Sequence, residues 1–285
     1  MDVRSLSPDR GNVPQPIRLI VLAGRPRNGT DPLAERFGVS HKCLIPLAGK
    51  PLIAHVLQTA VSHPRIASLA VCIERDGFEP VYDVLTRLPG RGTVALIEAR
   101  ESLADSVRAA AQGWDGPTIV TTADHALLSA ASIDALLDTL ETADIAFALT
   151  RREWVEAAHR AGRGHYLRLR DGDFAACDLY GMSGPQALRA IEVFRGDRFD
   201  RSGQRIARAT GALGLLRVML GLETLYGAIA RASRRLALKV GAVILGDGSQ
   251  AIDIDDDRTY AVVRDLLETR HVEPVEEEAP RRAVA

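Results

Sequence analysis

Two periodicities alternate along the first 150 residues of the chain. Nearly continuous apolar runs such as IRLIVLAG at 17–24 are typical of strands buried on both faces. Between them, apolar residues recur at helical spacing, as in KPLIAHVLQTAVSH at 50–63, which predicts amphipathic helices. The predicted strands cover 17–24, 68–74, 93–98, 117–124 and 144–150, and the predicted helices cover 50–63, 79–88, 102–112 and 131–141. This alternation implies crossover connections and a mostly parallel sheet.

The pattern changes after residue 150. HYLRLRD at 165–171 and FAACDLYGM at 174–182, separated by a turn at Gly172, predict a β-hairpin. Residues 184–236 are largely helical in pattern, and a strand at 236–245 and a helix at 257–270 follow. That last strand needs a sheet to join, so we expect an inserted helical subdomain at 184–236 and not a separate domain. The predicted fold is α/β, a Rossmann-like three-layer sandwich with a mostly parallel central sheet.

The two ends of the chain differ in composition from the part between them. Residues 1–16 are rich in Pro, Gly, Ser and charge, which predicts a flexible arm. Residues 271–285 combine an acidic run with two prolines and are expected to be a disordered tail. The domain itself is therefore expected to span 17–270.

Composition excludes several classes of protein. The 36 basic and 37 acidic residues nearly cancel, so no overall field attracts the chain to nucleic acid. The N-terminus lacks the apolar core of a signal peptide, and no apolar run reaches the roughly 18 residues that span a bilayer. Cys43, Cys72 and Cys177 form no metal or disulfide pattern and are expected to be buried. These features predict a soluble, cytoplasmic protein without integral membrane association; its oligomeric state stays open.

The loop after the first strand is the first candidate site, because ligands of parallel α/β sheets collect at the carboxyl ends of the strands. Gly24 allows backbone N–H groups to face an anion, and Arg25 and Arg27 add positive charge. Lys42 precedes an apolar run that must return over the end of this strand, so its ammonium group is expected to be held in place. Lys50 is a secondary candidate.

The segment LAG, a long polar loop and KCLIPLAGKPLI resembles the signature of the sugar-phosphate nucleotidyltransferases, in particular the MobA-like NTP transferases. The resemblance covers residues 17–150 and 238–270, and it implies a GT-A-like fold. It also implies that Leu22, Ala23, Gly24 and Arg25 contact the triphosphate, with Lys42 nearest the reacting α-phosphate. The chain departs from the family in its longer loop and in Arg25, which stands where a second small residue is usual.

Acidic residues follow two further predicted strands. Asp124 ends the β-branched run TIVTTAD, where a carboxylate projects into the crevice or caps the next helix. Asp253 and Asp255 alternate in QAIDIDDD and are expected to share one face of a short strand. The resemblance implies that Asp124 and one of these two hold Mg²⁺ (Mn²⁺ is an alternative), Asp253 being the first choice. His125 is expected to be a structural neighbour or to contact the acceptor, since Mg²⁺ prefers oxygen ligands.

Two more groups of residues are candidates for substrate contacts. Ser102 and Ser106 lie where relatives cover the nucleobase, although Ser102 and Asp105 also form a helix-capping pair. The arginines of the helical insertion are either a solvated face or a clamp for the acceptor phosphate. The clamp residues would be Arg195, Arg198 and Arg205.

These observations predict a Mg²⁺-dependent nucleotidyltransferase that uses an NTP and a phosphorylated small-molecule acceptor and releases pyrophosphate. CTP is slightly favoured over GTP, and the acceptor is not identified. A GT-A-fold glycosyltransferase is one alternative, but its usual acid-x-acid pair is replaced here by ADH. A nucleotide-binding regulatory protein that has lost catalysis is the other alternative.

Overall fold

The computed structural model describes residues 15–26, 29, 31–88, 93–162, 164–194 and 202–272. The main-sheet strands are β1 (Ile17–Leu22), β4 (Ile66–Ile73), β5 (Thr93–Glu98), β6 (Thr118–Thr122), β7 (Ile145–Arg151), β8 (Leu167–Leu169), β9 (Gly172–Met182) and β10 (Val240–Leu245). Their order in the sheet is β10-β7-β9-β6-β1-β4-β5, and β8 pairs with β9 at the side. Strand β9 is antiparallel to β6 and β7, and β8 is antiparallel to β9, whereas the remaining pairs are parallel.

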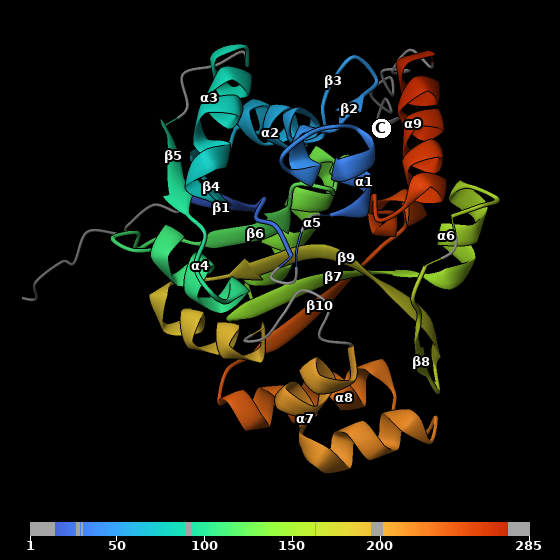
Figure 1. Ribbon diagram of the computed structural model, residues 1–285. Coiled ribbons are helices and arrows are strands. Elements are labelled where there is room, and N and C mark those ends of the chain that lie inside the picture. Colours follow the sequence, from blue (N-terminus) through green and yellow to red (C-terminus); the bar gives the residue numbers. More distant parts are fainter. Residues whose placement is uncertain are drawn as a thin grey trace, which may run out of the picture.

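Helices cover both faces of this sheet, which gives the three layers that the sequence predicts (Figure 1). On one face lie α2 (Leu52–Ser62), α3 (Phe78–Thr86) and α5 (Ala130–Leu140). On the other face lie α4 (Leu103–Ala110), the 3₁₀ segment η3 (Pro185–Phe194), α7 (Ser202–Met219) and α8 (Leu225–Leu236). The sequence of β1 is continuously apolar because both faces of the strand are covered. Leu19 and Val21 pack on the first face, and Ile20 packs on the second.

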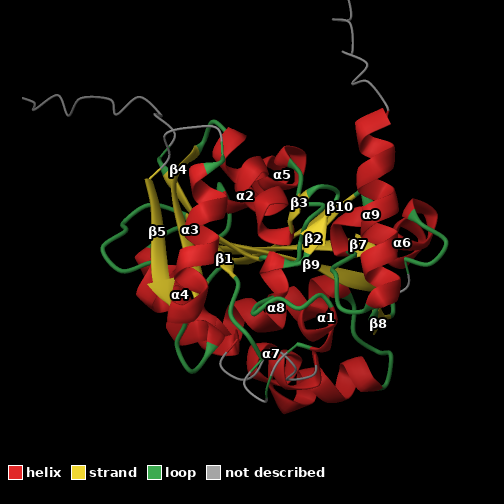
Figure 2. Ribbon diagram, turned by 45° about the horizontal axis from the view of Figure 1, so that its top comes forward, coloured by secondary structure: helices red, strands yellow, loops and turns green. Residues whose placement is uncertain are grey.

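A second group of helices lies at the end of the sheet where β6 stops. Here α1 (Pro32–Arg36), α6 (Arg152–Ala158) and α9 (Asp257–Val272) share a small apolar cluster, and α9 stands beside α1 and α6 in both views (Figure 2). A two-stranded ribbon of β2 (Pro46–Leu47) and β3 (Lys50–Pro51) belongs to the same region. Three short 3₁₀ segments complete the fold: η1 (Lys42–Leu44), η2 (Arg75–Gly77) and η4 (Gly248–Ala251).

Apart from the short strand expected around Asp253, the predicted elements are found with small shifts of their ends, including the β8–β9 hairpin and the helices between 185 and 236. The predicted arm and acidic tail lie almost entirely outside the described residues, and the division of the chain at 17 and 270 stays a prediction. Within the described part of the chain, no helix combines the length and the apolar character needed to cross a bilayer.

Candidate active site

The candidate site begins where β1 and β6 end side by side. Leu22 is in register with Thr122, and the Ala123 N–H donates to the Leu22 carbonyl at 2.9 Å. The loops that carry Gly24 and Asp124 therefore leave the sheet at neighbouring positions. The side chains of Leu22 and Ala23 are buried, so these two residues can offer a ligand only their backbone.

Lys42 is the cation at the centre of this site. It opens η1, and its neighbours His41 and Cys43 are buried, which fixes the backbone from which it projects. Its Nζ donates to Asp124 Oδ2 at 2.7 Å and to Asp255 Oδ1 at 2.9 Å. Burial alone would lower the pKa of Lys42, but the charges and hydrogen bonds of the two aspartates hold that pKa above its ordinary value. The sequence prediction that Lys42 is held in place is thus consistent with this geometry.

Asp253 lies beside this pair, in the segment between η4 and α9. Ile252 and Ile254 are buried in the cluster under α9, so Asp253 and Asp255 project from the other side of the same extended segment. The predicted short strand is wrong, because residues 252–255 are extended but pair with no strand of the described chain. Alternation along an extended backbone nevertheless places both aspartates toward Lys42.

Asp178 is a fourth carboxylate, which the sequence analysis missed. It lies in a bulge of β9, where Phe147 pairs with Tyr180 and Leu149 pairs with Ala176, and its φ is 38°. Burial raises the pKa of Asp253 well above its ordinary value, and the charges of Asp178 and then Asp124 raise it further. The signal in the sequence was a single acidic residue inside the apolar strand FAACDLYGM.

The donor set of the site fits a hard divalent cation that also binds substrate. Asp253 Oδ1 is buried and accepts no hydrogen bond from the described residues. At the same time, no group of three or more His, Cys, Asp or Glu side chains among the described residues is arranged to hold a metal by itself. Mg²⁺ commonly takes one or two carboxylates and completes its shell with water and substrate phosphates. The arrangement therefore suits a cation that arrives with a phosphorylated ligand.

Arg25 is turned away from the aspartates and toward the residues that follow β4. Its backbone N–H donates to Glu74 Oε1 at 3.0 Å, its Nε donates to His41 Nε2 at 3.2 Å, and its guanidinium is ion-paired with Asp76. The carboxylate of Glu74 thus faces a backbone N–H that the sequence analysis assigned to phosphate. In this conformation Arg25 is tied to η2, and a role on the triphosphate requires its pair with Asp76 to open.

The remaining candidates on the nucleotide side have partners of their own. Lys50 Nζ is hydrogen-bonded to Gln58 on α2, apart from the aspartates. Ser102 caps α4 as predicted: its Oγ accepts from the Asp105 N–H at 3.1 Å and donates to Asp105 Oδ2 at 2.6 Å. Ser106 Oγ accepts from the Arg100 N–H at 2.8 Å. Both serines shape the loop after β5, and this use of their hydroxyls favours a structural role.

Of the candidates on the acceptor side, the structure describes the side chain of His125 alone. His125 is fully buried, and its Nδ1 lies 3.1 Å from Thr121 Oγ1. Burial lowers the pKa of His125 to about 4, so the ring is neutral and supports the turn behind Asp124. Its burial argues against a contact with the acceptor. Arg195 and Arg198 lie outside the described residues, and of Arg205 only the helical backbone is described.

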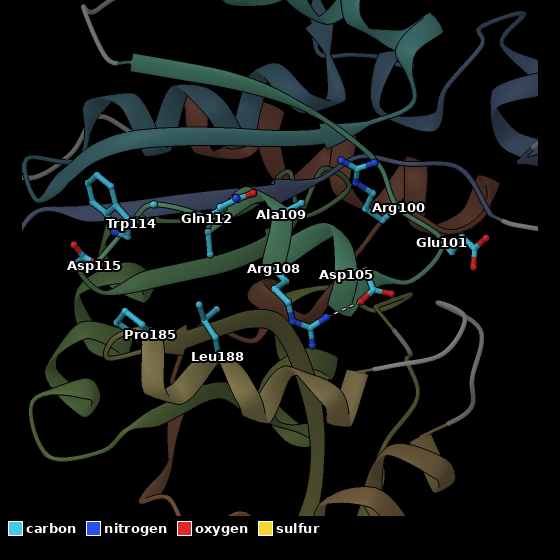
Figure 3. Close-up of a pocket in the computed structure, with 12 residues that line it drawn as sticks. Arg100, Glu101, Asp105, Arg108, Ala109, Gln112, Trp114, Asp115, Pro185 and Leu188 are labelled. Atoms are coloured by element: carbon cyan, nitrogen blue, oxygen red, sulfur yellow. Dashed lines mark hydrogen bonds and ion pairs between the residues drawn. The ribbon is translucent and has the colours of Figure 1, made fainter.

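An open groove of about 740 Å³ lies between α4 and η3, away from Lys42 and the aspartates (Figure 3). Arg108 spans it, with Nη1 at 2.6 Å from Asp105 Oδ1 and a second ion pair to Glu192. Trp114, Asp115 and Pro185 lie together in the picture, apart from Arg100 and Glu101. Arg108 is thus neutralised by two acids, and neither Lys42 nor any of the four aspartates lines the groove.

Three comparisons with known proteins bear on this site. The model of the MobA-like NTP transferase domain matches residues 20–213. The bifunctional protein GlmU of Clavibacter sepedonicus is 31% identical over 183 residues, which cover 61% of this chain and 35% of that protein. The chain thus spans about a third of this curated relative.

Two solved structures share the fold. A hypothetical transferase of Thermus thermophilus superposes with a TM-score of 0.66 at 24% identity, covering 86% of this chain and 99% of that one. A CMP:2-keto-3-deoxy-manno-octonic acid synthetase complexed with CTP superposes with a TM-score of 0.55 at 12% identity, covering 90% of this chain and all of that one (100%).

Proposed function

Since the chain belongs to the MobA-like NTP transferase domain family, a family of nucleotidyltransferases, we propose that it transfers a nucleoside monophosphate from an NTP to a phosphorylated small-molecule acceptor. The observation that carries this proposal is the Lys42 ammonium, paired with Asp124 and Asp255 at the end of β6. This is a charged, partly enclosed position at the carboxyl ends of parallel strands, where such sheets bind their ligands.

In the proposed reaction, a phosphate oxygen of the acceptor forms a bond to the α-phosphorus of the NTP. The bond from that phosphorus to the bridging oxygen of the leaving group breaks, and pyrophosphate departs with the electron pair. No protein nucleophile is needed, so the residues of the chain act by positioning and by charge. Lys42 donates hydrogen bonds to the phosphate oxygens on which negative charge gathers.

Lys42 can reach a triphosphate by exchanging one partner. The Asp255 side chain is 75% exposed whereas that of Asp124 is 7% exposed, so the contact with Asp255 is the one that opens at lower cost. Asp124 keeps the ammonium group in place during this exchange. Gly24 and the backbone N–H groups after β1 then lie along the phosphates, once Glu74 and Asp76 release Arg25.

Asp124 and Asp253 are the residues that would hold Mg²⁺, with Asp255 the alternative to Asp253 and Mn²⁺ an alternative ion. When bound, such an ion supplies charge neutralisation of the triphosphate and polarisation of the α-phosphate. The unpartnered oxygen of Asp253 supports this assignment. The charge of Asp178 repels that of Asp253 and so raises the electrostatic cost of leaving the site without a cation.

CTP is the nucleotide that we propose first, and GTP second. This order is supported by a superposed synthetase whose structure was determined with CTP. The acceptor is proposed only as a phosphorylated small molecule, because the described part of the insertion places no arginine side chain beside Lys42 or the aspartates.

The test is nucleotide-dependent thermal stabilisation followed by a pyrophosphate-release assay. One NTP at a hundred times its dissociation constant should stabilise the fold by about 2.7 kcal/mol in the presence of Mg²⁺. Asp124→Asn should abolish this stabilisation, whereas Asp138→Asn, an exposed aspartate of α5, should keep it. The NTP so identified is then tested with a panel of sugar, polyol and lipid-head-group phosphates.

Three results would count against the proposal. Stabilisation by nucleotide sugars alone would indicate a glycosyltransferase. Stabilisation by an NTP without pyrophosphate release from any acceptor would indicate a nucleotide-binding regulatory protein. The absence of any response to nucleotides would show that the loop after β1 no longer forms a nucleotide site.

A further inference from the structure

The helical hairpin formed by α7 and α8, with its connection, carries most of the exposed large apolar side chains of the described residues. Eight large apolar side chains are exposed among the described residues, and six of them lie between residues 213 and 226. Met219 and Tyr226 are the most exposed, at 75% and 80%. The six residues are Leu213, Leu216, Met219, Leu220, Leu222 and Tyr226, which we call the hairpin patch.

The hairpin patch has a definite place in the molecule. Leu213, Leu216 and Leu220 recur at the spacing of one helix face, and Met219, Leu220 and Leu222 surround the connection between the helices. The layer formed by α7 and α8 lies below the sheet, on the side opposite α2 and α3 (Figure 1). Large apolar side chains exposed together in one segment are typical of an interaction site.

The charge of the same segment is strongly one-sided. Residues 202–239 contain seven basic residues and one acidic residue, Glu223, a net charge of +6, whereas the whole chain has a net charge of −1. Glu223 is 2% exposed and is buried between Arg217 and Arg231, which donate to it at 3.1 and 2.7 Å. The segment therefore presents no carboxylate of its own to a partner.

Basic residues also lie next to the hairpin patch. Arg234 and Arg235 are exposed at the end of α8, about two turns along the helix from Tyr226. Arg170 is exposed in the β8–β9 turn, and its N–H donates to the Glu223 carbonyl at 2.8 Å, which fixes it beside the connection. Leucine, methionine and tyrosine side chains rimmed by arginine are the composition of surfaces that lie in a lipid headgroup layer.

From this arrangement we propose that the hairpin patch binds the surface of an anionic lipid bilayer. The apolar side chains of the connection would enter the headgroup and acyl boundary, and Arg170, Arg234 and Arg235 would face the lipid phosphates. The charge argues against a second copy of this chain as the partner, because a two-fold contact would bring the two cationic hairpins together. The proposal is independent of the transferase reaction.

The test is sedimentation of the full chain with vesicles of phosphatidylcholine alone and of phosphatidylcholine with phosphatidylglycerol. Binding is expected to the anionic vesicles and is expected to weaken in high salt. Met219→Asp/Leu220→Asp should lower the partition coefficient at least about ten-fold. Arg234→Gln/Arg235→Gln should lower it about twenty-five-fold, at about five-fold for each arginine. The matched control is Tyr82→Asp, which changes a 61% exposed apolar residue on the opposite face and should bind as the wild type does.

Four outcomes would overturn the proposal. Two concern the wild type: equal binding to neutral and anionic vesicles, or no binding to either. The other two concern the Met219→Asp/Leu220→Asp variant: undiminished vesicle binding, or the loss of a dimer that the wild type forms. The last result would assign the hairpin patch to a second copy. If the variant fails to fold by thermal melting, hydrogen exchange of the wild type decides. Protection of residues 213–226 by anionic vesicles supports the proposal, and unchanged exchange there contradicts it.

Discussion

The Lys42 ammonium lies 2.7 Å from a carboxylate oxygen of Asp124, although 82 positions separate the two residues in the sequence. Their meeting follows from the parallel pairing of β1 with β6, which brings the ends of both strands to one place. Both side chains are mostly enclosed, with exposed fractions of 14% for Lys42 and 7% for Asp124. An ion pair in such a position organises the site, but it also leaves an uncompensated charge if either partner is removed.

Lys42→Met should therefore lower activity and stability together. We expect pyrophosphate release to fall at least about 100-fold, because a preorganised donor to the phosphates is lost. The free energy of unfolding should fall by about 3 kcal/mol, since Asp124 remains buried without its cation. Part of this loss should return on addition of Mg²⁺. Lys50→Met is the matched control, and comparable losses in that variant would show that Lys42 has no special role.

The Arg25–Asp76 ion pair predicts a gain of function. Asp76→Asn should release the guanidinium and allow it to turn toward the triphosphate, so the dissociation constant for the NTP should fall a few-fold. Arg25→Ala should raise the same constant. Isothermal titration of both variants, with the exposed Asp83→Asn on α3 as control, measures the effect. If Asp76→Asn binds the nucleotide as the wild type does, Arg25 is a structural residue of the loop.

Gly77 lies against His41, the residue that precedes η1. A Cβ at residue 77 would lie 2.5 Å from Ile73 Cδ1 and 2.9 Å from His41 Cε1, both in the interior. Gly77→Ala should destabilise the fold by about 1–3 kcal/mol, the usual cost of overpacking, and should also weaken nucleotide binding because Lys42 follows His41. Gly164→Ala, where no atom lies within 4 Å of the added Cβ, should do neither. Chemical denaturation with nucleotide titration separates the two effects.

Much of this fold could be predicted from the sequence, because strands buried on both faces and amphipathic helices have clear periods. The short elements could not be predicted, because α1, α6 and the β2–β3 ribbon contain too few residues to show a hydrophobic periodicity. The β2–β3 turn relies on positive φ at Ala48 and Gly49, and alanine gives little sign of such a conformation.

The candidate site was predictable where a residue follows a strand and unpredictable where tertiary contacts decide. Asp124 was named from its place at the end of an apolar run, and Lys42 from its place before one. Asp253 and Asp255 were named from their alternation and from the family resemblance, and the structure places all four residues near one another. Asp178 was missed because a bulge places it, and bulges leave only a weak trace in sequence. The partners of Arg25 were missed as well, since Glu74 and Asp76 reach it only through the pairing of β1 with β4.

His125 gives a prediction about the dependence of stability on pH. Burial lowers the pKa of its side chain from the ordinary 6.5 to about 4 in the folded chain. As the pH falls below 6.5, the unfolded chain takes up a proton that the folded chain refuses until about pH 4, so the free energy of unfolding decreases across this window. The full effect is on the order of 3 kcal/mol.

His125→Asn retains a hydrogen-bonding group for Thr121 and removes the titration, so its stability should fall less steeply between these pH values than that of the wild type. Denaturant unfolding at several pH values measures the slopes, and His165→Asn, at an exposed position, corrects for the loss of a histidine as such. Equal slopes in the wild type and His125→Asn would show that the buried ring accepts its proton without unfolding.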